Sequence, residues 1–255
     1  MSRRQKVGYG VLAVAFAIVI VAVSLRGPIA QDLAYHLFAD GRNYFLIPNF
    51  WNVISNVAFL VVGAIGIHGV LRESGFTYIA ENRSGYLLLF LGASLVSVGS
   101  GYYHLWPDND SLVWDRLPMT IAFMALLSVV VSEFISIRVG KWLLWPLQVL
   151  GIFSVFYWYI SEQDGQGDLR YYALVQFLPM LTIPLILIFF RCAYTRASGY
   201  GWLLGAYGLA KLFEHYDEAI YQSLGFISGH SLKHITAAAG LYLLIVSYQY
   251  RLLRD

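Results

Sequence analysis

The sequence predicts an all-α fold: a polytopic membrane helix bundle with a seven-helix core and one extra N-terminal transmembrane helix. Apolar residues make up 58% of the 255 residues and charged residues only 13%, whereas soluble domains carry about 25% charged residues. The chain also contains eight apolar stretches of spanning or near-spanning length. These observations exclude an ordinary soluble domain. The net charge of +2 is too small to suggest a nucleic-acid partner.

The eight stretches follow one another without a tandem repeat or a long polar linker, which predicts one compact bundle. The single cysteine, Cys192, excludes an internal disulfide. The last two stretches carry polar groups at one end, so their edges are the least defined. In chain order, the stretches are Tyr9–Leu25, Phe50–Leu71, Tyr86–Leu105, Leu117–Ile135, Trp142–Ile160, Tyr171–Phe190, Tyr200–Ile220 and Leu232–Tyr250.

The first stretch follows Arg3, Arg4 and Lys6, as the apolar part of a signal peptide would. It is long for such a segment, however, and no cleavage site of the A-x-A type follows it. We therefore expect a retained anchor helix. This divides the chain into an N-terminal anchor helix and outer loop, residues 1–48, and a seven-transmembrane core, residues 49–255.

Lysine and arginine predict the orientation, because cytoplasmic loops carry an excess of both. With eight spans the loops alternate sides, and eleven of these residues fall on the side of the two termini against six on the other. Both termini are therefore expected in the cytoplasm. The eleven are Arg3, Arg4, Lys6, Arg72, Arg83, Arg138, Lys141, Arg191, Arg196, Arg251 and Arg254; the six are Arg26, Arg42, Arg116, Arg170, Lys211 and Lys233.

Two polar clusters interrupt the apolar stretches with the spacing of a metal site. Ser100 and His104 are four residues apart, as are His230 and His234, so each pair shares one helix face. Three imidazoles from two helices can occupy three corners of a zinc tetrahedron and leave the fourth open for water. Together with Asp115, all five residues fall near the same, exoplasmic face in the predicted topology. Ionisable groups inside membrane segments are usually functional.

Each of these residues also has an ordinary structural interpretation. A histidine at a helix end is often an amphipathic side chain at the membrane interface. The His230/His234 pair lacks the glutamate of the H-E-x-x-H metalloprotease motif, because Ser231 follows His230. Ser100 could be a small residue for helix packing, and Asp115 a loop carboxylate paired with Arg116.

Further polar residues lie near the same end of the predicted bundle. Lys211 and Glu214 are three residues apart and can pair on one helix face, and Asp217 follows them. This group is either an internal ion pair or a source of carboxylate partners for a metal-binding histidine. His36 and His215 could approach the site, whereas His68 falls at the cytoplasmic end of its stretch and is left out.

The order Ser-x-x-x-His, then Asp, then His-x-x-x-His resembles the alkaline ceramidase family, which belongs to a superfamily of membrane hydrolases that includes adiponectin-receptor-like proteins. The eleven-residue step from His104 to Asp115 is similar to that family. The segment Asn49-Phe50-Trp51-Asn52-Val53-Ile54-Ser55-Asn56 looks like the motif before its first core helix. The resemblance covers about Asn49 to Tyr250, strongly at the five site residues and weakly between them.

The resemblance implies that His104, His230 and His234 bind zinc, with Ser100 and Asp115 beside the metal-bound water. One feature departs from the eukaryotic members, which bind calcium through an acidic stretch before the first core helix. The matching region here is Ala39-Asp40-Gly41-Arg42-Asn43-Tyr44, with Asn49 in place of a glutamate. We therefore expect no calcium regulation.

The resulting hypothesis is a zinc-dependent amidohydrolase that cleaves the amide bond of ceramide or a related N-acyl lipid in the membrane. The alternative is a lipid-sensing receptor or binding protein in which zinc is structural. A closed four-ligand site would favour the receptor, and an open position with water the enzyme. A transporter is disfavoured because no two halves with corresponding interrupted helices occur. The oligomeric state stays open.

Overall fold

The computed structural model describes residues 1–72 and 75–254, and every regular element within them is helical. Residues 73–74 and 255, which belong to the predicted core, lie outside the described residues. The elements in chain order are α1 (Arg3–Leu25), η1 (Leu33–His36), α2 (Phe50–Ile54), α3 (Val57–Leu71), η2 (Ala80–Asn82), α4 (Arg83–Leu105), α5 (Asn109–Phe134), α6 (Ile137–Gln163), α7 (Arg170–Phe189), α8 (Ser198–His215), α9 (Asp217–Leu224) and α10 (Gly229–Tyr250).

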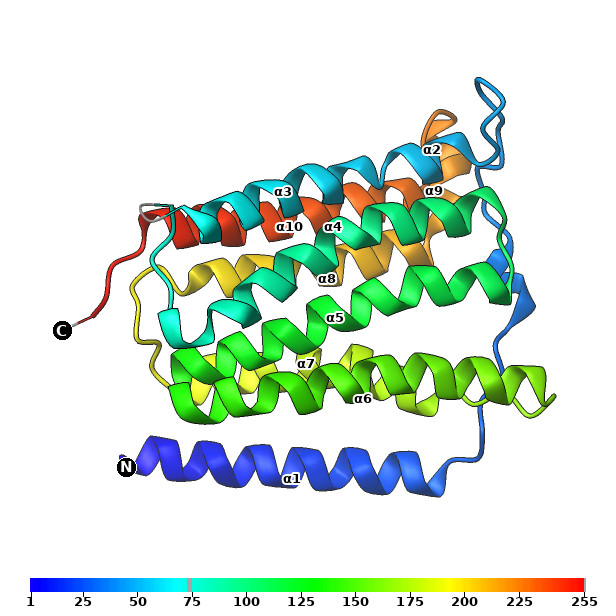
Figure 1. Ribbon diagram of the computed structural model, residues 1–255. Helices are drawn as coiled ribbons and strands as arrows, with labels where there is room; N and C mark the ends of the chain where they lie inside the picture. The colour runs from blue at the N-terminus through cyan, green and yellow to red at the C-terminus, as the bar shows by residue number, and fades with distance from the viewer. Residues whose placement is uncertain (73–74, 255) are drawn as a thin grey trace.

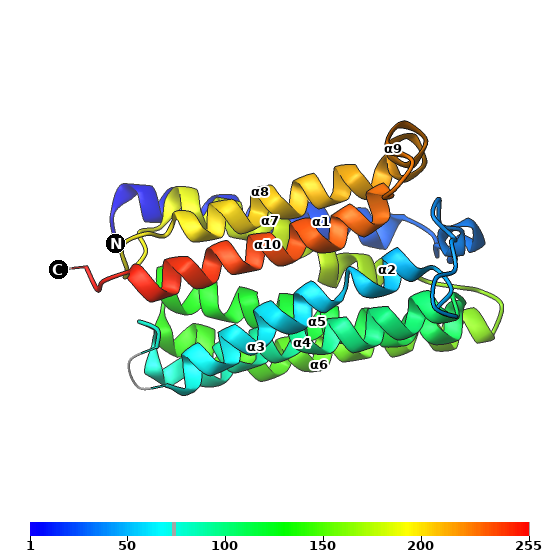
Figure 2. The same cartoon turned by 90° about the horizontal axis from the view of Figure 1, so that it is seen from above.

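The long helices lie side by side along one common direction (Figure 1). Both chain termini lie at the same end of this bundle, and α4 ends and α10 begins at the opposite end, as the view from above also shows (Figure 2). Helix α1 lies at the edge of the bundle and packs against α7. The end remote from the termini therefore gathers the C-terminus of α4, the N-terminus of α5 and the N-terminus of α10.

Burial separates a central helix from a peripheral one. Helix α5 packs against α4, α6 and α7, and 72% of its most apolar 18-residue segment is buried. In α1 the corresponding share is 11%, and the side chains of Val14, Ile18 and Ile20 are about 60% exposed. A helix that is apolar on all sides and exposes these side chains is suited to lipid rather than water. The protein is therefore a multi-pass membrane protein.

Six helices in the described part of the chain are long and apolar enough to cross a membrane. This confirms the predicted helical membrane bundle but not the count of seven core spans plus one, because α8 and α10 do not belong to the six. The six are Arg3–Leu25, Phe50–Leu71, Ala80–Leu105, Asn109–Phe134, Ile137–Gln163 and Arg170–Phe189.

Capping residues move several helix boundaries away from the edges of the apolar stretches. Helix α5 begins at Asn109 rather than Leu117, because the Asp108 carboxylate accepts a 2.6 Å hydrogen bond from the Ser111 backbone N–H and the Ser111 hydroxyl bonds the Asp108 backbone N–H. Helix α10 likewise begins at Gly229 rather than Leu232, because the side chain of the N-cap residue Ser228 accepts a hydrogen bond from the Ser231 backbone N–H. Asp115 therefore lies inside α5 rather than at its start.

The seventh predicted stretch, Tyr200–Ile220, is not one helix. Helix α8 ends at His215, and the short helix α9 begins at Asp217. Asp217 and Glu218 lie in the first turn of α9, where negative charge is favoured by the helix dipole. The chain therefore turns between α8 and α10 at the end of the bundle that carries the polar clusters.

Glycine allows α4 and α5 to approach closely near that end. A β-carbon on Gly99 would lie 1.9 Å from the backbone oxygen of Trp114, and one on Gly92 would lie 2.8 Å from the backbone nitrogen of Ala122. Small residues at such crossings let two helix backbones meet. The contact at Gly99 brings the last turns of α4, which carry Ser100 and His104, against the turn of α5 that carries Asp115.

Candidate metal centre

Three histidines converge at this end of the bundle. His104 lies in the last turn of α4, and His230 and His234 lie in the first turns of α10. One ring nitrogen from each falls within 4.8 Å of the other two, and the side chains are between 1% and 5% exposed. The ring centroids are 4.8 to 5.1 Å apart. The structure thus brings together the three predicted ligands, and they could hold a metal ion.

The positions of the ring nitrogens fit a metal. Nε2 of His104 and Nε2 of His230 lie 3.3 Å apart. Two metal–nitrogen bonds of about 2.0–2.1 Å at a tetrahedral angle also separate the nitrogens by about 3.3 Å. Nδ1 of His234 is bonded to the Ser55 hydroxyl at 2.8 Å, which leaves its Nε2 free. Nδ1 of His104 is buried and has no hydrogen-bond partner among the described residues.

Ser55 and Phe38 complete the surroundings of the three rings. Ser55 ends α2 and orients the His234 ring, which is the usual role of an outer hydrogen-bond partner at a metal site. The ring of Phe38 packs edge-on against both His104 and His230, with centroids 4.7 Å away in each case. Neither residue was predicted from the sequence as part of the site, although Ser55 lies inside the segment Asn49–Asn56 that resembles the family motif.

Asn49, the first residue of that segment, supports the end of α4. Its side-chain amide donates a 2.8 Å hydrogen bond to the backbone oxygen of His104. Its φ of 50° is in the left-handed region, which asparagine tolerates better than most residues. Asn49 therefore holds the candidate ligand His104 in place through the His104 backbone.

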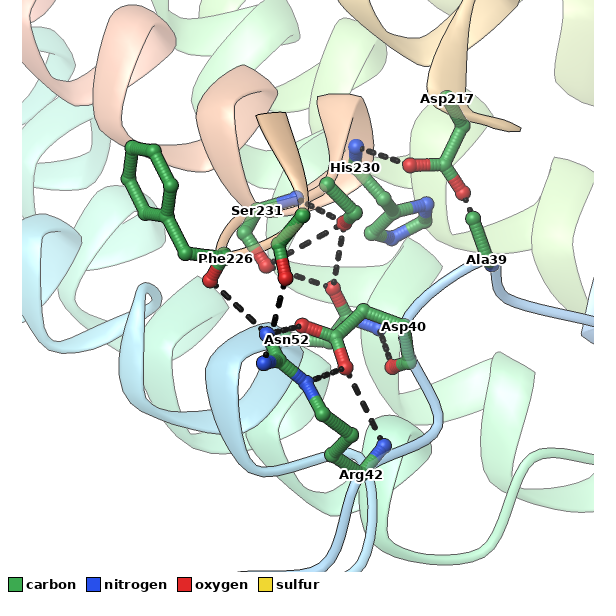
Figure 3. A network of polar contacts seen from close by, with 10 residues as sticks. Ala39, Asp40, Arg42, Asn52, Asp217, Phe226, His230 and Ser231 are labelled. Atoms are coloured by element: carbon green, nitrogen blue, oxygen red, sulfur yellow. Dashed lines mark hydrogen bonds and ion pairs between the residues drawn. The ribbon is translucent and has the colours of Figure 1, made fainter. Parts of the chain in front are cut away.

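Asp217 positions the start of α10 rather than an imidazole ring. Its carboxylate accepts a 2.6 Å hydrogen bond from the backbone N–H of His230 and a 3.1 Å bond from that of Ala39 (Figure 3). The predicted pair of Lys211 and Glu214 is present at 2.6 Å, and Lys233 joins the same carboxylate at 2.7 Å. Among the described residues, neither the Asp217 nor the Glu214 carboxylate forms a hydrogen bond or ion pair with a histidine ring.

A second polar network ties the segment before α2 to the loop before α10. The Arg42 guanidinium bonds both carboxylate oxygens of Asp40, at 2.7 and 2.8 Å, and the backbone oxygen of Phe226 (Figure 3). The bond with Asp40 raises the pKa of Arg42 above its usual range. Asn52 donates to the backbone oxygen of Asp40 and accepts from the Ser231 hydroxyl at 2.7 Å. Arg42 therefore places a positive charge beside Asp40 in the segment before α2.

A cavity of about 510 Å³ reaches the histidine cluster from inside the bundle. Ser100, Asp115 and His234 all line it, and most of the remaining lining is apolar. Ser100 is 2% exposed and Asp115 is 9% exposed. The structure thus places both predicted catalytic residues on the wall of the same cavity as one candidate metal ligand. Such a mostly apolar pocket with a few converging polar groups is typical of a small-molecule site.

The other histidines do not join the cluster. His36 bonds the Tyr103 hydroxyl at 2.9 Å and the Asn109 side chain at 3.0 Å. The ring of His215 packs against that of Tyr216. His68 lies in the last turn of α3, at the end of the bundle that carries the chain termini. Its exclusion from the predicted site is consistent with this position.

A family model described as Ceramidase matches residues 42–254, which span α2 to α10. The chain belongs to the ceramidase family. This confirms the resemblance seen in the spacing of the site residues, and it leaves α1 outside the matched region. No curated protein matches the chain significantly. Membership of the ceramidase family implies a membrane-associated amide hydrolase with a lipid substrate.

Proposed function

We propose that this ceramidase-family protein is a zinc-dependent membrane enzyme that hydrolyses the amide bond of ceramide or a related N-acyl lipid. The observation that carries the proposal is the convergence of three buried histidines from α4 and α10, one of which, His234, lines a cavity together with Ser100 and Asp115. Three protein ligands with an open fourth position are the usual set of a catalytic zinc site, whereas structural sites use four.

His104, His230 and His234 are the residues that would hold the ion. Three neutral imidazoles suit zinc, and the 3.3 Å between Nε2 of His104 and Nε2 of His230 matches its bond lengths. When bound, zinc lowers the pKa of its water to about 7 and polarises a carbonyl group. This supplies the reactivity that a neutral amide requires, because such an amide resists water at pH 7.

Asp115 and Ser100 carry the remaining steps. The Asp115 carboxylate takes a proton from the attacking water, whose oxygen bonds the amide carbon, and passes that proton to the nitrogen as the C–N bond breaks. The Ser100 hydroxyl donates a hydrogen bond to the carbonyl oxygen while negative charge develops there. The products are a fatty acid and an amine. The apolar walls of the cavity hold the acyl chain and exclude further water.

The proposal is tested by purifying the full chain, measuring zinc, and incubating the protein with a panel of amide-linked lipids. We expect about one zinc per chain and release of fatty acid, because three histidines form a single site. Activity should persist with a calcium-selective chelator that spares zinc, since Arg42 already neutralises Asp40. Zinc and lipid binding without fatty-acid release from any lipid would favour the lipid-sensing receptor instead.

We further propose eight membrane crossings, with both termini in the cytoplasm and the metal centre near the exoplasmic face. The eleven-to-six distribution of lysine and arginine supports this orientation, as does the location of both termini at one end of the bundle. Reporter fusions at Asp255 and within residues 161–169 should fall on opposite sides, with the latter outside. The same side for both fusions would contradict the eight-span topology.

A further inference from the structure

One cation in the cavity wall lacks a counter-charge. The side chain of Arg116, on α5, is 5% exposed and lines the cavity. Its Nη2 donates a 2.6 Å hydrogen bond to the side-chain oxygen of Gln31, and its guanidinium lies 4.0 Å from the ring centre of Trp158 and 4.5 Å from that of Tyr172. Its Nη1 has no hydrogen-bond partner, and no carboxylate in the described residues pairs with it.

The immediate surroundings do not neutralise this charge. Cation–π contacts with two rings stabilise a buried guanidinium, but they leave its net charge in place. Glu162 is the carboxylate nearest along the hydrogen-bond network, and it accepts from the backbone N–H of Gln31 at 2.5 Å and the indole N–H of Trp158 at 3.1 Å. Buried charges are normally paired, because the desolvation of an isolated charge is costly. An unpaired buried arginine therefore points to a partner that arrives with the ligand.

The other charged groups of the cavity do not compensate Arg116 either. Lys211 and Lys233 both line the cavity and share the carboxylate of Glu214. The carboxylate of Glu214 is thus already shared by two lysines. Asp32 also lines the cavity, but it belongs to an exposed segment and its carboxylate accepts from the backbone N–H of Ala34. In apolar surroundings a positive charge without a paired carboxylate strongly attracts an anion.

We propose that Arg116 is the head-group subsite of this cavity and that the substrate is an N-acyl lipid with an anionic group close to its amide. This inference rests on the proposed amide hydrolysis. Asp115 and Arg116 are consecutive residues of α5, about 1.5 Å apart along the helix axis. Both residues line the same cavity, so a lipid whose amide meets Asp115 can also place an anionic group at the guanidinium of Arg116. An N-acyl amino acid has this form, because one carbon separates its carboxylate from the amide nitrogen.

Ceramide is the less suitable ligand for this wall. Its head group offers hydroxyls, which would leave the Arg116 charge uncompensated. Hydrogen bonds between a guanidinium and a carboxylate or phosphate are roughly twice as strong as those between neutral groups. We therefore expect Arg116 to make the enzyme prefer lipids with an anionic head group, whereas Asp115 and Ser100 act on the amide bond.

The test compares two lipids that differ only at the proposed contact: an N-acyl glycine and the N-acyl ethanolamine with the same acyl chain. Both kcat/KM and equilibrium binding are measured with the zinc-loaded full chain in detergent or vesicles. We expect the acid to exceed the alcohol at least about tenfold in both measurements, as for one charged hydrogen bond. Ceramide 1-phosphate against ceramide, measured alongside, distinguishes a phosphate from a carboxylate as the anionic group.

Variants assign the preference to Arg116. Arg116→Gln keeps hydrogen-bonding groups but removes the charge, so the acid-to-alcohol ratio should fall by at least about tenfold. Arg116→Lys keeps the charge and should retain part of the preference. Arg138→Gln, in the exposed first turn of α6, is the matched control and should leave the ratio unchanged.

The outcomes separate this inference from the proposed function. Equal kcat/KM and equal binding for each anionic lipid and its neutral counterpart in the parent would overturn the subsite, and this measurement needs no variant. An unchanged ratio in Arg116→Gln would overturn it as well. Tighter binding of the acid that depends on Arg116, with no hydrolysis of any lipid, would overturn the proposed hydrolase and leave the subsite standing.

Discussion

Alanine in place of His230 is expected to remove the bound zinc and with it all measurable hydrolysis. Three protein ligands leave little redundancy, so the loss of one should lower zinc affinity by more than the roughly 10- to 100-fold that follows from loss of an outer hydrogen-bond partner. His104→Ala and His234→Ala should behave in the same way, because the three ring nitrogens form one cluster within 4.8 Å. Zinc per chain, measured by metal analysis after dialysis, checks the expectation.

His68→Ala is the matched control, since His68 is a histidine at the opposite end of the bundle. It should retain the parental zinc content. Ser55→Ala provides an intermediate case, because it removes the partner of His234 Nδ1 without removing a ligand. Its zinc affinity should fall by about 10- to 100-fold. Full retention of zinc in His230→Ala would show that the three histidines are not the ligand set.

Asparagine in place of Asp115 is expected to lower turnover by about a hundredfold or more while the zinc content stays near the parental value. The substitution keeps the shape of the side chain but removes the base that moves the proton from water to the leaving amine. Asp115 is also 9% exposed on the cavity wall, so bulk water cannot easily take over this role. Hydrolysis rate and zinc per chain are measured on the same preparation.

Two companion variants sharpen this result. Ser100→Ala should slow turnover by about a hundredfold if its hydroxyl stabilises the carbonyl oxygen, again without loss of zinc. Asp110→Asn, an exposed carboxylate in the first turn of the same helix, should have the parental rate. If Asp115→Asn hydrolyses ceramide-like amides at the parental rate, the mechanism as written is wrong and the receptor becomes the better account.

Local patterns in the sequence were sufficient for the class of fold and the candidate ligands. The low charge and the long apolar stretches follow from the need to satisfy every backbone group inside a membrane, which helices do within one segment. The four-residue spacing of His230 and His234 places both on one face of any helix that contains them. The order of polar residues was also specific enough to indicate the ceramidase family, which the match over residues 42–254 confirms.

Helix ends were harder to predict, because hydropathy does not report capping. The cap formed by the Asp108 carboxylate starts α5 earlier than hydropathy predicts. The break between His215 and Asp217 divides a stretch whose hydropathy predicts one span. The marginal hydropathy of α8 and α10 has a related cause. These two helices carry Lys211, Glu214 and Lys233, which line the cavity and lower the mean hydropathy of the segments that contain them.

By itself, the sequence determined that this chain is a helical membrane protein of the ceramidase family with histidines, a serine and an aspartate at candidate site positions. The tertiary structure decided which of these residues meet. The 3.3 Å approach of His104 to His230 and the contact of Ser55 with His234 each join residues that are far apart in the chain. The packing of the helices also leaves Nη1 of Arg116 without a hydrogen-bond partner among the described residues. Periodicity describes one helix at a time, whereas these contacts depend on how closely neighbouring helices pack, as at Gly99.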